Sequence, residues 1–226
     1  MKLIKRVHAY LLKGAIAFTI LSVGALTAHA EMKLFSLKNI HLNIIDDYKS
    51  VKHISRQKLM AALQTKDKGN YLIFDVREKD EFAVSHIKDA KLLLPSTWKS
   101  SFFKKYGEQI KGKQIIFYCS VGVRSTKMAK YLEQSLKEQG AKEIYNLEEG
   151  IFGWANQGAP LYKFDENGRA AEMKINDKKQ SRIEVVEDKA QKKLTKKEIN
   201  TTTKVHPYNN HWGQLITDET LRSYTP

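Results

Sequence analysis

The chain has 226 residues, a formal net charge of +14 at pH 7 and 42% hydrophobic residues, which suits one domain with a substantial core plus additional segments rather than two domains. Its single cysteine excludes an intramolecular disulfide bond. A charge of this size is common in proteins that bind nucleic acids or anionic membranes. Here the lysines are scattered and no nucleic-acid-binding motif is present, so we expect no nucleic-acid partner.

The first 30 residues have the features of a secretory signal peptide. Basic residues without any acid come first, an apolar run follows, and residues 28–30 (Ala-His-Ala) offer a cleavage site. We expect cleavage after Ala30, a periplasmic or secreted location, and no membrane span in the mature chain. Two alternatives stay open. One is an uncleaved membrane anchor, for which the apolar run falls short of the roughly 20 residues that a spanning helix needs, and the other is a mitochondrial presequence.

The rest of the chain divides into four parts. Residues 31–50 mix apolar and charged residues without a clean period, and we expect an N-terminal arm over the core. Residues 51–163 are expected to form the domain. Residues 164–203 are predicted to be a basic, polar insertion or linker, because residues 174–200 hold nine Lys or Arg against five Asp or Glu. Residues 204–226 regain aromatic side chains and are expected to dock on the domain as a tail.

Within the domain, apolar runs typical of buried strands alternate with segments typical of helices. Strands are predicted at residues 51–55, 71–76, 113–119 and 142–147, with a further strand closed by Pro95. Helices are predicted at residues 56–66, 97–111 and 125–140, with a short helix or turn at 77–85 and a turn-rich segment at 148–161. This alternation predicts an α/β domain with a mainly parallel sheet.

Four residues of the tail could be interpreted as a metal or ligand cluster: His206, Tyr208, His211 and Trp212. The two histidines lack cysteine or carboxylate partners at ligand spacing, so we predict docking of the tail and no metal site. We also hypothesise that the tail packs beside the loop that follows Cys119 and shapes the access of an acceptor.

The only cysteine, Cys119, lies where a predicted strand meets a glycine-containing loop that leads into a helix. Backbone N–H groups of such a loop and the positive end of the helix dipole favour a thiolate, a persulfide or a bound oxyanion. Gly122 permits a tight curl, and Arg124 adds a permanent cation. An inert buried thiol is the alternative, because cysteine is often buried. The candidate binding loop consists of Ser120, Val121, Gly122, Val123, Arg124 and Ser125.

Three segments resemble the rhodanese-type sulfurtransferases. The motif Cys119-x-x-Gly122-x-Arg124-Ser125 resembles their active-site loop, and residues 75–95 and 146–161 resemble two further signatures of that family. The resemblance covers about residues 50–163. It implies a rhodanese-like fold, in which a five-stranded parallel sheet is flanked by helices on both faces.

The same resemblance implies a reaction and a reactive residue. Cys119 would take sulfane sulfur from a donor such as thiosulfate and pass it, as a persulfide, to a thiophilic acceptor such as cyanide or a thiol. No cofactor is implied. The expected partners are a small sulfur donor and acceptor, with a protein thiol as an alternative acceptor.

The resemblance also implies residues that brace the site rather than react: Asp75, Arg77, Glu81, His86, Glu149 and Trp154. Asp75 and Arg77 are expected to form hydrogen bonds and an ion pair, with Glu81 as a candidate partner. His86 is expected in a packed turn, and Trp154 in the core or in a lid.

Three residues depart from the glycines of the family pattern. Ser85 and Asp89 suggest different turns in the second signature. Glu149 stands near the mouth of the expected site, where its carboxylate would either repel anionic donors or point to solvent.

Rival functions remain at this point. Cys119 and Arg124 have the spacing Cys-x4-Arg, whereas cysteine-dependent phosphatases use Cys-x5-Arg, so the loop is too tight for phosphate or arsenate chemistry. An exported persulfide carrier or sulfur-binding protein with a dedicated protein partner would use the same cysteine. A fold retained only as a structural module is disfavoured, because the cysteine, the loop length and the arginine are intact.

Overall fold

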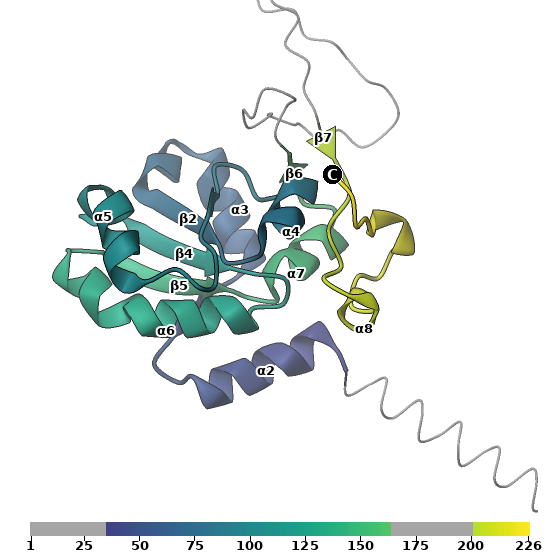
Figure 1. Ribbon diagram of the computed structural model, residues 1–226, viewed down its shortest axis with the longest axis horizontal. Coiled ribbons are helices and arrows are strands. Elements are labelled where there is room, and N and C mark those ends of the chain that lie inside the picture. Colours follow the sequence, from purple (N-terminus) through teal and green to yellow (C-terminus); the bar gives the residue numbers. More distant parts are fainter. Residues whose placement is uncertain (1–34, 164–200) are drawn as a thin grey trace, which may run out of the picture.

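The computed structural model describes residues 35–163 and 201–226 (Figure 1). The predicted signal peptide at residues 1–30 and nearly all of the predicted insertion lie outside the described residues. Among the described helices, none combines the length and apolarity required to cross a membrane.

The centre of the domain is a five-stranded sheet with the strand order β1-β5-β4-β2-β3 (Figure 1). Every neighbouring pair is parallel. The strands are β1 (Lys52–Ile54), β2 (Tyr71–Asp75), β3 (Lys91–Leu92), β4 (Gln114–Tyr118) and β5 (Glu143–Leu147). The predicted α/β domain with a five-stranded parallel sheet is therefore confirmed. Because all strands run in one direction, their carboxyl ends share one edge of the sheet.

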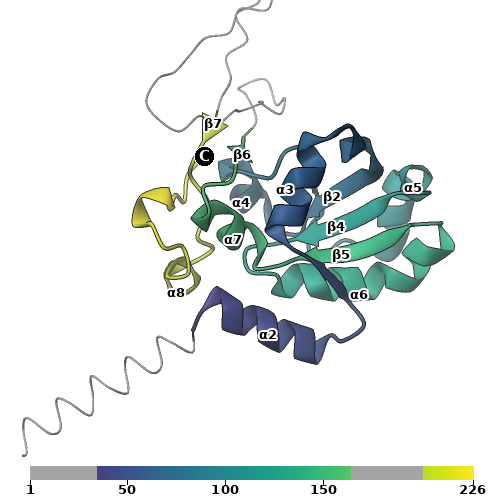
Figure 2. The same ribbon diagram turned by 180° about the vertical axis from the view of Figure 1, so that it is seen from behind.

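Helices cover both faces of this sheet, as expected. The helices of the domain are α3 (Arg56–Gln64), α4 (Lys79–Val84), α5 (Lys99–Ile110), α6 (Val123–Glu138) and α7 (Gly150–Asn156), with a short 3-10 helix η1 (Lys66–Asn70). The side chain of Ser55 caps α3 by accepting a hydrogen bond from the N–H of Lys58 at 3.2 Å. Figure 1 views the molecule from the side of α6, and Figure 2 from the side of α3.

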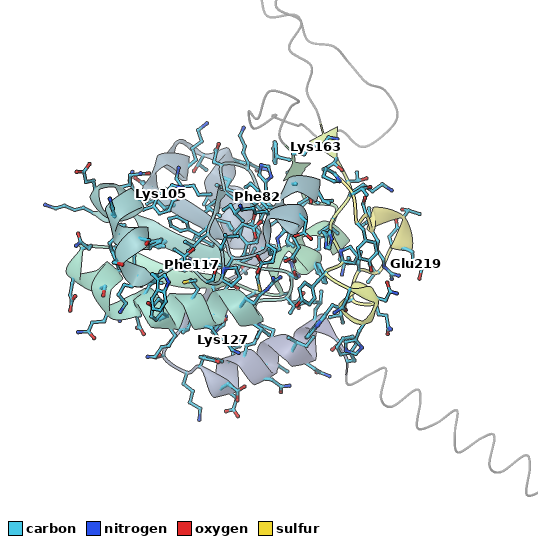
Figure 3. The ribbon with its side chains drawn as sticks, in the orientation of Figure 1. Phe82, Lys105, Phe117, Lys127, Lys163 and Glu219 are labelled. Carbon is cyan, nitrogen blue, oxygen red and sulfur yellow. The ribbon has the colours of Figure 1, made fainter. Side chains whose placement is uncertain are left out.

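Successive residues of β4 point to opposite faces and so belong to two different cores. Phe117 and Cys119 pack with the buried residues of α5 and α6, whereas Tyr118 packs with those of α3 and α7. Phe117 lies inside the molecule, while Lys105 of α5 and Lys127 of α6 are exposed on its surface (Figure 3). The strand is thus buried on both faces, which explains its continuous apolar run.

The predicted N-terminal arm contains a helix, α2 (Leu37–Asp47), whose buried residue is Ile44. Leu37 and Ile40 also pack against the core from its inner side. On its outer side, Leu42 and Ile45 are 51% and 41% exposed. These two exposed apolar residues obscure the helical period in the sequence, so the sequence predicted no helix here.

The segment after the undescribed residues returns to the domain. Strand β7 (Thr201–Thr202) pairs antiparallel with β6 (Leu161–Tyr162), so the return begins before the predicted boundary at residue 203. The segment continues through α8 (Asn210–Gly213) and the 3-10 helix η2 (Glu219–Leu221). It lies beside α4 and α7, at the end of the molecule opposite α5 (Figure 1 and Figure 2).

Candidate active site

Cys119 follows the last residue of β4, and the loop after it leads directly into α6. The side chain is 1% exposed. Its Sγ accepts a hydrogen bond from the backbone N–H of Gly122 at 3.2 Å and lies 3.5 Å from the Oγ of Ser125. The N-terminus of α6, where the dipole is positive, therefore faces the sulfur.

Gly122 is required by the geometry of this loop. Its φ of 102° lies in the left-handed region that residues with a side chain rarely adopt. A Cβ there would lie 3.2 Å from Nδ2 of Asn146 and 3.3 Å from Cδ1 of Ile44. The loop thus curls tightly between β5 and α2.

Helix α7 supports the loop from behind. The backbone N–H groups of Ile151 and Phe152 donate to the carbonyl oxygens of Cys119 and Ser120 at 2.8 and 3.0 Å. Gly150 allows this approach, because a Cβ on it would lie 2.6 Å from the oxygen of Ser120 and still closer to that of Cys119. Within the turn-rich segment predicted at residues 148–161, Gly150–Asn156 form a helix that supports the loop after Cys119.

Arg124 is fixed by a buried carboxylate from α4. Its Nη1 and Nη2 donate to Oε2 and Oε1 of Glu81 at 2.7 and 2.8 Å. Ser120 joins the pair, since its Oγ accepts from Arg124 at 2.9 Å and donates to Glu81 at 2.9 Å. Such a two-pronged, charge-assisted pair is both strong and directional.

The ionisation of this pair follows from its surroundings. Burial alone would raise the pKa of Glu81, but the hydrogen bonds and charge of Arg124 lower it below its ordinary value. Burial alone would lower the pKa of Arg124, yet Glu81 and Cys119 raise it above its ordinary value. Both groups therefore stay charged at neutral pH, and the cation stays beside Cys119.

Asp75 and Arg77 form a second ion pair at the end of β2, with both side chains 0% exposed. Nε and Nη2 of Arg77 donate to Oδ1 and Oδ2 of Asp75 at 2.8 and 2.7 Å, and Nη2 also donates to the carbonyl oxygen of Ser85. The expected ion pair thus forms between Asp75 and Arg77 themselves, and Glu81 interacts with Arg77 only through its charge. Arg77 is bound by the carboxylate two residues before it, which leaves Glu81 for Arg124.

His86 and Trp154 are structural in this arrangement. His86 exchanges backbone hydrogen bonds with Tyr162 at 2.8 and 2.9 Å, and its ring stacks on Phe82 at 4.3 Å. Burial lowers the pKa of His86, so its ring is neutral at pH 7. Trp154 is 1% exposed and donates through Nε1 to the carbonyl oxygen of Pro160 at 2.9 Å, which makes it a core residue rather than a lid.

Glu149 neither points freely to solvent nor presents an unpaired charge to the mouth. Its carboxylate forms an ion pair with Arg56, in which the two side chains are 21% and 14% exposed. Glu149 and Asp89 have φ values of 58° and 61°. Both therefore keep the left-handed backbone that suits the glycines of the family pattern, whereas Ser85 is extended.

Comparisons with known proteins agree with this geometry. The family model for the rhodanese-like domain matches residues 58–157. The thiosulfate sulfurtransferase GlpE of Coxiella burnetii is 32% identical over 108 residues, which cover 47% of this chain and 87% of that protein. The chain belongs to the rhodanese-like family.

The chain covers a smaller share of some other relatives. The tRNA uridine(34) hydroxylase of Onion yellows phytoplasma is 30% identical over 124 residues, covering 50% of this chain but only 38% of that protein. Among solved structures, a rhodanese-related protein from Thermoplasma volcanium has 24% identity and a TM-score of 0.38, covering 49% of this chain and 96% of that one.

A polar chain that the sequence did not indicate links the rhodanese-like loop to β1. Ser125 donates through Oγ to Oδ1 of Asn146 at 2.6 Å, and Nδ2 of Asn146 lies 3.3 Å from Nδ1 of His53. Burial and the charge of His41 lower the pKa of His53 to about 4, so His53 is neutral at pH 7 and can accept this bond. His53 and Asn146 are opposite each other in the parallel register of β1 and β5, which is the signal that could have found them.

Two residues of the C-terminal segment reach the site from outside the matched rhodanese-like region. The ring of Tyr208 lies over the guanidinium of Arg124, with 4.9 Å from Cζ to the ring centroid. His206 is buried, and its Nε2 lies 4.0 Å from Oδ2 of Asp80.

The other two residues of the suggested tail cluster lie elsewhere. The rings of His211 and Trp212 pack on Phe35, at 4.4 and 5.7 Å. In residues 35–163 and 201–226, His, Cys, Asp and Glu do not gather in any group of three or more that could hold a metal ion.

Proposed function

We propose that this rhodanese-like protein is a sulfurtransferase that carries sulfane sulfur on Cys119. The observation that carries the proposal is the placement of Sγ against the N–H of Gly122 at the start of α6, with Arg124 held beside it by Glu81. A helix N-terminus and a fixed cation favour the thiolate, which is the nucleophilic form of cysteine. The similarity to a thiosulfate sulfurtransferase supports the same chemistry.

The reaction proceeds in two displacements. With thiosulfate as donor, the thiolate of Cys119 attacks the outer sulfur, a new S–S bond forms on Sγ, and sulfite leaves with the electrons of the broken S–S bond. An acceptor then attacks the terminal sulfur of the persulfide. Cyanide leaves as thiocyanate, and the thiolate is restored.

The loop supplies the stabilisation that these steps need. Charge would build on the terminal sulfur and on the departing group beside Cys119, which follows the last residue of β4. Backbone N–H groups that are already oriented there stabilise such charge without reorganising.

Intact mass measurement tests this proposal directly. After incubation with thiosulfate, the wild type should gain about 32 Da, the mass of one sulfur atom, and cyanide should remove it and release thiocyanate. Because the chain has a single cysteine, Cys119→Ser should show no gain. A wild type that loads no sulfur from thiosulfate, 3-mercaptopyruvate or a persulfide would contradict the proposal. A loaded sulfur that cyanide does not discharge would favour the alternative of a carrier with a protein partner.

The location is a separate part of the proposal. We propose export through the leader at residues 1–30, with the mature chain beginning at Glu31. N-terminal sequencing of the protein from the periplasmic fraction or the medium would test this. Recovery only of the uncleaved chain would contradict it.

A further inference from the structure

The residue that covers the cation of the active site comes from outside the rhodanese-like region. Tyr208 belongs to the C-terminal segment, and its ring lies 4.9 Å from Cζ of Arg124. We infer that Tyr208 is a specificity-determining residue that screens Arg124 and makes the site discriminate against negatively charged reagents. This inference rests on the proposed function, because it concerns which sulfur donors reach Cys119.

Tyr208 is held in place rather than resting on the surface by chance. Its φ of 65° is in the left-handed region, which costs about 1 kcal/mol for a residue with a side chain. Its N–H donates to Nδ1 of the buried His206 at 3.0 Å, which fixes the turn. Strain that persists at a residue touching a reactive site is an indication of function.

The segment that carries Tyr208 is anchored on both sides of this turn. Val205, Leu215 and Ile216 are buried in the same core cluster as Trp154. The amide of Asn156 on α7 donates to the carbonyl oxygen of Leu215 at 2.8 Å and accepts from the N–H of Thr217 at 3.0 Å. The ring is therefore presented to Arg124 by a fixed part of the fold.

Two kinds of contact reduce the electrostatic potential that Arg124 presents to solvent. Its edge is bound to Glu81 and Ser120, and one face is covered by the ring. The negative face of an aromatic ring attracts the cation and lowers its potential towards solvent. Arg77 and Arg56 are likewise paired, with Asp75 and Glu149.

This arrangement offers little attraction to a dianion such as thiosulfate. A donor whose sulfane sulfur is bound to the sulfur of an organic thiol, such as an organic persulfide RSSH, brings less charge to the mouth. In that case the thiolate of Cys119 attacks the outer sulfur, the donor S–S bond breaks, a new S–S bond forms on Sγ, and the thiol RSH leaves with the proton. We therefore expect the site to use organic sulfane sulfur more efficiently than thiosulfate.

Alkylation of the single cysteine tests the role of Tyr208 without requiring sulfur transfer. Iodoacetamide and iodoacetate have nearly the same size but differ by one negative charge. Tyr208→Ala should raise the rate constant for iodoacetate about three-fold relative to that for iodoacetamide, the size expected of an exposed cation–π contact. Tyr208→Phe keeps the ring and should restore the wild-type ratio.

Tyr131→Ala provides the matched control. Tyr131 is 46% exposed, compared with 48% for Tyr208, and it also stacks on a cation, Nζ of Lys99, at 5.0 Å. Its removal should leave the ratio unchanged. An unchanged ratio in Tyr208→Ala, or an equal rise of both rates, would overturn the inference, because the ring would then act at most as a steric cover.

Steady-state kinetics add a second measurement. Tyr208→Ala should lower the KM for thiosulfate with little change in kcat, since the ring acts on binding of the anion. A protein that loads no sulfur from any donor would refute the proposed function, and the alkylation ratio would still decide the role of Tyr208. A raised KM for thiosulfate in Tyr208→Ala would count against the inference.

Discussion

At the scale of single residues, Glu81 holds the guanidinium of Arg124 in its position beside Cys119. The carboxylate is 1% exposed and binds both Arg124 and Ser120. Removing one partner of a buried pair costs more than the pair contributes, because the other charge is left without compensation. We expect Glu81→Gln to lower the free energy of unfolding by about 2 kcal/mol and to slow alkylation of Cys119.

Urea unfolding and iodoacetamide kinetics measure these two effects. Glu133→Gln is the control, since Glu133 pairs on the surface of α6 with Lys130 and Lys137, whose side chains are 52% and 65% exposed. Glu133→Gln should lower the free energy of unfolding by less than about 1 kcal/mol. Equal costs for the two variants would contradict the role given to Glu81.

Acid titration of stability gives an independent measure of Glu81. Because its pKa is lower in the folded protein than in the unfolded chain, its charge contributes stability above the unfolded pKa of about 4.3. That contribution is lost as the pH falls towards the lowered pKa. The wild type should therefore lose more stability between pH 5 and pH 3 than Glu81→Gln, measured by urea unfolding at each pH. Parallel curves would show that the pKa of Glu81 is the same in the folded protein as in the unfolded chain.

His53 has the opposite sign of charge and a different pH window. Burial lowers its pKa to about 4, so the unfolded chain takes up a proton first as the pH falls below about 6.5. We expect His53→Gln to reduce the stability lost between pH 7 and pH 5 by about 1 kcal/mol, allowing for partial solvent access. Denaturant unfolding at both pH values would measure this. The same loss in variant and wild type would contradict a half-buried, neutral His53.

At the scale of elements, α7 contacts the loop after Cys119 through backbone hydrogen bonds. Gly150 has a φ of 56°, and an added Cβ would collide with the carbonyl groups of Cys119 and Ser120. Gly158, at the end of the same helix, has a φ of 64° and nothing within 4 Å of an added Cβ. Alanine substitutions at these two glycines therefore distinguish the free-energy cost of backbone strain from that of steric collision.

We expect Gly158→Ala to cost about 1 kcal/mol, the strain of a left-handed alanine. Gly150→Ala should cost at least about 3 kcal/mol more or fail to fold, because the strand end and the loop must move. Urea unfolding of both variants checks this. Similar urea midpoints for the two variants would mean that α7 is not packed tightly against the loop after Cys119.

At the scale of the whole molecule, the C-terminal segment is part of the core although it follows a long undescribed stretch. Ile216 is 0% exposed and belongs to the cluster of α3 and α7. We expect Ile216→Ala to lower the free energy of unfolding by about 2–4 kcal/mol in a single transition. Thr217→Ala, at an exposed position whose backbone N–H makes the contact with Asn156, should change it by less than about 0.5 kcal/mol.

A circular dichroism melt with matched denaturant titrations would distinguish these outcomes. Two transitions, or an unchanged stability in Ile216→Ala, would show that the segment unfolds independently of the domain. It could then not hold Tyr208 over Arg124.

Local patterns alone predicted much of the domain. The continuous apolar runs of β2 and β4 indicated buried parallel strands, because such strands are covered on both faces. The loop after Cys119 was predicted as a reactive site from its resemblance to the rhodanese active-site loop, whereas its residues alone also allowed an inert buried thiol. A motif confined to seven consecutive residues can be recognised without knowledge of the fold.

Only the tertiary structure showed which side chains form hydrogen bonds and ion pairs with the residues of the loop and of β5. Glu81 and Arg124 are 43 residues apart in sequence, and His53 and Asn146 are 93 apart, so no local pattern joins them. The helix α2 was hidden by exposed apolar residues, and Tyr208 was one aromatic residue among several in the tail. Residues at these separations meet only because parallel strands bring their carboxyl ends to one edge and the tail is anchored beside it. The sequence predicted Cys119 as the reactive group, whereas the fold decided what holds the loop around it and what covers Arg124.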